Sequence, residues 1–227
     1  MWPAILATVP IAVVTAHFAR QWLRARRLTK VRRAATWLAL TTVIPDVEEI
    51  TSGTVGVTTW NGRWNGHRVQ IRTIIDTLVT RKLPTLWLSV TLQEPVAIPA
   101  TFDMMMRPAS ATTFSNFDQL NHTVELPAQY PAESAIRTND ATARLPMTVI
   151  GQHLEIFSDG RAKELLVTPN GVRIVWMLAE ADRLRYGVLR QADFSGARLE
   201  AVLIDVLLNA ASALRADINR QSIGLAA

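Results

Sequence analysis

No cysteine occurs among the 227 residues of the chain. Disulfides, thiolate nucleophiles and cysteine-ligated zinc or iron–sulfur centres are therefore excluded. Histidine is scarce as well, and the four histidines do not occur in HxH, HExxH or HxxxH spacing: His17, His67, His122 and His153. The local sequence therefore predicts no metal site.

The sequence also lacks the short motifs that carry common catalytic chemistry. Gly53, Gly56, Gly62 and Gly66 are spaced for hairpin turns, without the GxGxxG pattern or the GK[ST] ending of a phosphate-binding loop. No serine lies in a GxSxG elbow. We therefore expect no catalytic residue and no cofactor, and predict that the chain is not an enzyme.

Acidic residues are absent from the first 45 positions, the first being Asp46. Residues 1–33 hold seven cations, whereas the rest of the chain has 17 basic and 19 acidic side chains. This distribution argues against a uniformly basic nucleic-acid-binding domain. At 49% hydrophobic and 19% charged residues, the chain has the composition of a folded protein.

What the N-terminus does contain is an uncharged run from Met1 to Ala19. A helix of this length spans about 28 Å, close to the thickness of a bilayer core. Trp2 and Trp22 would lie at its two interfaces. The cations that follow predict an N-terminus outside and a main domain in the cytoplasm of a bacterial inner membrane. A cleaved signal peptide and a buried core helix are the alternatives. The predicted interface cations are Arg20, Arg24, Arg26, Arg27, Lys30, Arg32 and Arg33.

His17 is the one strongly polar side chain in this run. Two interpretations are open: an interfacial histidine near Trp22, or an axial ligand of a chlorophyll-type or haem macrocycle. Antenna polypeptides of photosynthetic bacteria place such a histidine four residues after a small residue, and here that position is Val13. The interfacial interpretation is the simpler one.

These patterns predict an α+β chain with a single N-terminal transmembrane helix, a β-rich cytoplasmic domain and a long C-terminal helix. We place the anchor at 1–22, a basic juxtamembrane helix at 23–45 that ends at Ile44-Pro45, and the cytoplasmic domain at 46–227. The basic helix is expected to contact anionic lipid headgroups or an acidic partner.

Within the domain, alternation predicts a meander of strands over 54–60, 69–74 and 85–92, with tight turns at the Asn-Gly pairs 61–62 and 65–66. Short strands are expected near 101–106 and 121–126, a short helix over 132–144, and strands over 153–157, 164–167 and 172–178. An apolar stripe predicts a final helix from Ala197 to about Ile218.

Two tryptophans and two arginines gather around the first predicted hairpin: Trp60, Arg63, Trp64 and Arg68. Trp and Arg are favoured in protein interfaces, so these four residues are a candidate partner-binding patch. The alternative is a cross-strand aromatic pair beneath the hairpin.

The chain bears two resemblances. Gly53-Thr54, Gly62-Arg63, the Gly66–Val69 stretch, Phe117-Asp118, the strand at 152–158 and the final helix resemble uncharacterised bacterial membrane-anchored α+β proteins. Separately, Trp2–Trp22, Arg20–Arg33 and the order of domains resemble the plan of the H subunit, or another accessory subunit, of bacterial photosynthetic reaction centres. The second resemblance implies a subunit that caps a complex without binding its pigments.

We therefore predict a non-catalytic accessory subunit that is anchored in the membrane and stabilises a multi-subunit bacterial complex, with a photosynthetic reaction centre–antenna complex as the specific expectation. The alternative is a membrane-tethered ligand-binding or sensory module. A third possibility is an enzyme whose site carries no sequence motif. A broad apolar patch continuous with the predicted anchor would favour the accessory subunit, and a pocket lined by perturbed polar groups would favour the ligand-binding module or the enzyme.

Overall fold

The computed structural model describes residues 34–50, 57–77, 83–108, 112–189, 192–194 and 196–226. Residues 34–43 are helical, and this N-terminal helical segment ends just before Ile44-Pro45. The strands are β1 (Glu48–Ile50), β2 (Val57–Trp64), β3 (His67–Asp76), β4 (Thr85–Leu92), β5 (Phe102–Met106), β6 (His122–Val124), β7 (Ser134–Thr138), β8 (Ala162–Thr168) and β9 (Gly171–Glu180). The remaining elements are the 3-10 helices η1 (Phe117–Gln119) and η2 (Glu155–Ser158) and the helices α2 (Met147–Gly151), α3 (Arg183–Leu189) and α4 (Ala201–Ala226).

All nine strands join one antiparallel sheet in the order β1-β2-β3-β4-β9-β8-β5-β7-β6. β9 lies between β4 and β8 and so connects the N-terminal meander to the other strands. The β2–β3 hairpin turns at Asn65 and Gly66, whose φ angles of 49° and 82° suit the tight turn that matches strand twist. The second Asn-Gly pair, Asn61-Gly62, is part of β2, so the turn predicted there is absent.

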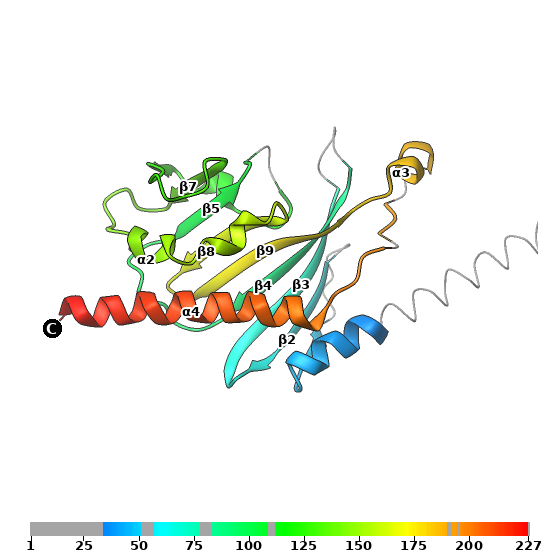
Figure 1. The fold of residues 1–227 in the computed structure, drawn as a ribbon, viewed down its shortest axis with the longest axis horizontal. Coiled ribbons are helices and arrows are strands. Elements are labelled where there is room, and N and C mark those ends of the chain that lie inside the picture. Colours follow the sequence, from blue (N-terminus) through cyan, green and yellow to red (C-terminus); the bar gives the residue numbers. More distant parts are fainter. Residues whose placement is uncertain are drawn as a thin grey trace, which may run out of the picture.

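One face of the sheet, here called the helix face, is covered by α4, which lies lengthwise across the strands (Figure 1). Alternate residues such as Ile71, Val90 and Ile174 point to it. α4 contributes a buried stripe at helical spacing, and each large aliphatic side chain in it adds about 1.5–3 kcal/mol by leaving water. The stripe consists of Ile204, Leu207, Leu208, Ala211, Leu214 and Ile218.

The opposite face carries a second, smaller apolar cluster. Phe114 and Phe117, from the segment before β6, pack with Ile74, Met105 and Val175. Met104 and Met106 belong instead to the main core on the helix face. The Met104–Met106 run thus fills two cores, because successive strand residues point to opposite faces.

The predicted fold class, in which a transmembrane helix precedes the β-rich domain, is corrected by the structure. The described residues form a nine-stranded antiparallel sheet with helices, and none of their helices is both long and apolar enough to cross a membrane. α4 has 26 residues, but its other sides carry charged side chains such as Asp205, Arg215 and Asp217. The predicted anchor at 1–22 and most of the predicted 23–45 helix lie outside the described residues.

Two local predictions are wrong. The helix expected over 132–144 is replaced by β7, where pairing with β5 and β6 outweighs the helical propensity of the alanines. The strand expected over 153–157 is replaced by η2, since Leu154 and Phe157 are buried three residues apart, a spacing that brings them to one side of a 3-10 turn. The meander, β5, β6 and α4 lie where the sequence predicts them, with α4 extending further at its C-terminal end.

Candidate binding site

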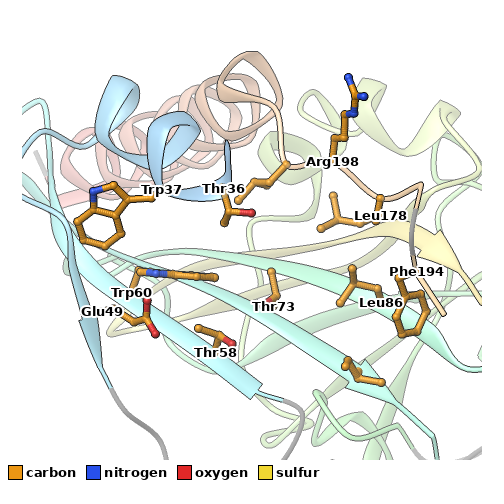
Figure 2. Close-up of a pocket in the computed structure, with 13 residues that line it drawn as sticks. Thr36, Trp37, Glu49, Thr58, Trp60, Thr73, Leu86, Leu178, Phe194 and Arg198 are labelled. Atoms are coloured by element: carbon orange, nitrogen blue, oxygen red, sulfur yellow. The ribbon is translucent and has the colours of Figure 1, made fainter. Parts of the chain in front are cut away.

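A pocket of about 420 Å³ opens on the helix face, between the N-terminal helical segment and the chain that leads into α4 (Figure 2). We call it the Trp60 pocket. Its floor is formed by strands β1 to β4 and β9, and its walls by the N-terminal helical segment and the chain before α4. The lining residues are Thr36, Trp37, Glu49, Thr58, Trp60, Thr73, Ile75, Leu86, Leu178, Phe194, Ala197, Arg198 and Leu199.

The wall formed by residues 34–47 is attached to β2 by a close backbone approach. A Cβ on Gly62 would lie 2.4 Å from Ile44 Cγ2 and 3.2 Å from Val47 Cα, so only glycine fits at this position without movement. The backbone N–H of Arg63 donates to Asp46 Oδ1 at 2.7 Å. Leu40 and Ile44 are fully buried in the main core. Together these contacts fix the position of Trp37 over the sheet.

The pocket is mainly apolar, with charged side chains from opposite sides. Figure 2 shows Trp37 and Trp60 on one side, Leu86, Leu178 and Phe194 on the other, and Arg198 at the margin. Trp60 is only 6% exposed, and its indole Nε1 is buried with no hydrogen-bond partner in the described part of the chain. Leaving a buried donor unpaired costs about 1–3 kcal/mol, and this indole N–H is shielded from the pocket as well as from solvent.

The apolar surface continues beyond the pocket onto the N-terminal helical segment. Trp37 is 41% exposed and Leu38 is 68% exposed, side by side in the sequence. Exposed large apolar side chains that adjoin a pocket are typical of interaction surfaces.

The structure does not place the four predicted hairpin residues on one surface. Trp60 and Trp64 point to the helix face and are buried, and Trp64 Nε1 donates to Asp205 Oδ1 on α4 at 3.2 Å. Arg63 and Arg68 are paired directly opposite each other on the other face, where both are exposed. The two indoles therefore pack beneath α4 and the N-terminal helical segment, whereas both arginines are at the surface of the other face.

The other predicted site residues lie outside the described residues: His17, Trp2, Trp22, Arg20, Arg24, Arg26, Arg27, Lys30, Arg32 and Arg33. Of the remaining histidines, His153 has its Nε2 2.9 Å from Asp217 Oδ2 of α4. In the part of the chain that the structure describes, no group of three His, Asp or Glu side chains is arranged to hold a metal ion.

A buried carboxyl pair lies on the opposite face of the sheet. Asp103 on β5 and Glu164 on β8 are diagonal neighbours, since Asp103 pairs with Leu166 and Glu164 with Met105. Both are almost completely buried. Arg173 Nη2 lies 2.8 Å from Glu164 Oε2, whereas Asp103 Oδ1 and Glu164 Oε1 have no hydrogen-bond partner among the described residues.

Burial determines how this pair ionises. Loss of solvation, followed by the neighbouring charge of Glu164, raises the pKa of Asp103 to about 8. Burial also raises the pKa of Glu164, while the guanidinium of Arg173 opposes that rise. Near neutral pH the pair therefore holds one proton on Asp103, and Glu164 is the partner of Arg173. Neither carboxyl lines the Trp60 pocket.

Sequence reasoning missed Trp37, Phe194 and Arg198 as pocket residues. These residues are brought together by the tertiary fold, and no sequence motif marks them. The unusual combination of Trp37 and Leu38 beside polar threonines was the available local signal.

Comparisons with known proteins add a distant structural likeness. No protein-family model matches the sequence, and no curated protein matches it. Among solved structures, the chain is similar to the mycobacterial trehalose monomycolate transport factor A, TtfA, with a TM-score of 0.46 and 12% identity, over 85% of this chain and 94% of that chain. A likeness at this level transfers neither activity nor partners, and the resemblance to reaction-centre subunits stays a prediction.

Proposed function

We propose that this chain is a non-catalytic accessory subunit of a larger complex, and that an apolar segment of a partner protein occupies the Trp60 pocket. The observation that carries the proposal is the continuity of the pocket with the exposed side chains of Trp37 and Leu38.

The composition of the pocket suits a protein partner. Tryptophan and arginine are the residue types that most often dominate binding energy at interfaces, and Trp37, Trp60 and Arg198 all line this pocket. A volume of about 420 Å³ accommodates a few apolar side chains of an inserted segment. Arg198 would meet an acidic group of that segment at the margin of the pocket.

A second candidate is a ligand-binding module, the alternative predicted from the sequence. The apolar lining and the guanidinium of Arg198 would also suit a small amphipathic molecule with an anionic group. The two functions use one pocket, so the occupant decides between them.

The decisive experiment introduces a photo-crosslinking amino acid at Leu38 in the native host and identifies the cross-linked species. Recovery of one protein subunit at defined stoichiometry supports the accessory role. Trp37→Ser should then reduce co-purification of that subunit at least tenfold, because its apolar contact is lost. Leu184→Ser is the matched control, since Leu184 is 80% exposed on α3, away from the pocket.

Two results would overturn the accessory role. The first is equal loss of the subunit in both variants. The second is a tightly bound small molecule, seen by native mass spectrometry of the purified full chain and lost in Arg198→Gln.

The identity and location of the complex stay predictions from the sequence. Purification in mild detergent, followed by an absorption spectrum, tests the reaction-centre assignment: photosynthetic pigments should accompany the chain. Protease added to sealed right-side-out vesicles tests the predicted inner-membrane location, because a cytoplasmic domain should survive digestion.

A further inference from the structure

Along each strand of the meander, successive side chains point to opposite faces of the sheet. This alternation brings several arginines onto the face that α4 does not cover. Arg63 on β2 is the direct partner of Arg68 on β3. Arg72, four residues after Arg68, points to the same face, and so does Arg173 on β9. We call these four residues the arginine face.

Within the arginine face, Arg63 and Arg68 are direct cross-strand neighbours, and arginines do not alternate with acidic residues. Like charges directly opposite each other in an antiparallel pair are destabilising. Within the described ranges, no carboxylate oxygen lies within 4 Å of a guanidinium nitrogen of Arg63, Arg68 or Arg72. Arg63 Nη1 donates to the carbonyl of Gly66 at 3.3 Å, a local contact that leaves its charge uncompensated.

Arg72 is in a similar position further along the sheet. It is half-buried, and burial, together with the charge of Arg173, lowers the pKa of its guanidinium. Arg173 itself is paired with Glu164. The second buried carboxyl, Asp103, is protonated near neutral pH, so it does not compensate the arginines.

Acidic side chains offset part of the charge of this face. Glu48 points to it from the edge strand β1, in the row of Asn61. Asp76, four residues after Arg72 on β3, points to the same face and is buried. Glu94 accepts from the backbone N–H of Arg68, and this hydrogen bond, together with the charges of His67, Arg215 and Arg68, lowers its pKa. The exposed guanidinium groups of Arg63 and Arg68 are therefore the positive part of the arginine face.

We propose that the arginine face binds an acidic segment of a partner protein. Guanidinium groups pair with carboxylates through parallel hydrogen bonds, which single exposed lysines do not offer. Arg68 and Arg72 are about 13 Å apart along β3, the span of four residues in an extended chain. The exposed Ile50 lies in the same cross-strand row as Arg72 and supplies an apolar contact beside the charges.

A protein segment fits these features better than a nucleic acid or a membrane. A phosphate backbone needs many cations in a continuous track, and here Glu48 interrupts the face at its edge. The face is on the other side of the sheet from the Trp60 pocket, so the two proposals stand or fall separately.

The test uses the purified full chain and a fluorescein-labelled 12-residue peptide with glutamates four positions apart. Anisotropy should show binding that weakens as salt rises, and little binding of the same peptide with glutamine in place of glutamate. Arg63→Gln combined with Arg68→Gln should weaken binding about tenfold, as expected for two exposed ion pairs. Circular dichroism and thermal unfolding establish that this variant is folded.

The matched control is Arg144→Gln combined with Arg183→Gln, which removes the same charge at exposed positions elsewhere. It should bind the peptide like the unmodified chain, and so should Trp37→Ser. Equal weakening in the arginine-face and control variants would overturn the proposal, as would equal binding of the two peptides. Tighter, arginine-dependent binding of phosphatidylserine vesicles or of a DNA duplex would also overturn it, in favour of a membrane or nucleic acid.

Discussion

Replacement of Asp103 by asparagine should make the protein more stable at pH 7 and remove most of the pH dependence of its stability between pH 4 and pH 8. An aspartate in an unfolded chain has a pKa of about 3.9, whereas burial raises the pKa of Asp103 in the folded chain to about 8. Between these values the folded state holds a proton that the unfolded state has released. The free energy of unfolding therefore falls as pH rises through this range.

The magnitude follows from the interval between the two pKa values. At pH 7, about three pH units above the unfolded value, the cost of keeping Asp103 protonated is on the order of 4 kcal/mol. Asparagine keeps the shape of the protonated side chain and cannot ionise. The variant should gain up to this amount at pH 7 and almost nothing at pH 4.

Urea unfolding followed by tryptophan fluorescence at pH 4, 5, 6, 7 and 8 measures the effect. Asp118→Asn is the control, because the side chain of Asp118 is 57% exposed and its removal should change stability by no more than about 0.5 kcal/mol. Parallel pH profiles for the unmodified chain and Asp103→Asn would refute the reasoning, since they would mean that the buried carboxyl carries no excess proton in the folded state.

Two further predictions concern the packing that shapes the Trp60 pocket and the helix face. Gly62→Ala should lower stability by about 1–3 kcal/mol, because its Cβ would overlap Ile44; Gly160→Ala, with nothing within 4 Å, is the control in the same thermal-denaturation assay. Leu207→Ala should cost about 2–5 kcal/mol by opening a cavity beneath α4, while Val202→Ala, at a position 72% exposed on the same helix, should change stability by less than about 0.5 kcal/mol. Equal effects within either pair would contradict the assigned contacts.

The parts of the fold that were predictable from the sequence are those in which local pattern and tertiary environment agree. The stripe through Leu207 and Leu214 marks α4 because each turn of the helix meets the same sheet. The Asn65-Gly66 pair marks the hairpin because its backbone conformation is needed there. At Ile136 and Phe157 the local pattern is ambiguous, and pairing with distant strands or packing three residues apart decides the outcome.

The candidate sites were less predictable, since each depends on residues that the sheet order brings together. Asp103 stands before three methionines, and nothing nearby indicates that Glu164 becomes its diagonal neighbour. In the sequence, Arg72 occupies a polar position of a strand in which polar and apolar residues alternate. Its relation to Arg63 and Arg68 follows from the hairpin register, which also turns Trp60 and Trp64 the other way.

The central position of β9 has a consequence for the order in which the protein can be assembled during synthesis. The meander of β1 to β4 is complete by residue 92, and β5 to β7 follow by residue 138, yet these two groups share no strand pairing until the β8–β9 hairpin has been made. α4, which covers the helix face, comes later still in the chain. A nascent chain therefore carries a half-sheet with a bare apolar side while more than 100 further residues are translated. Such a chain is exposed to aggregation and is a natural client for ribosome-associated chaperones.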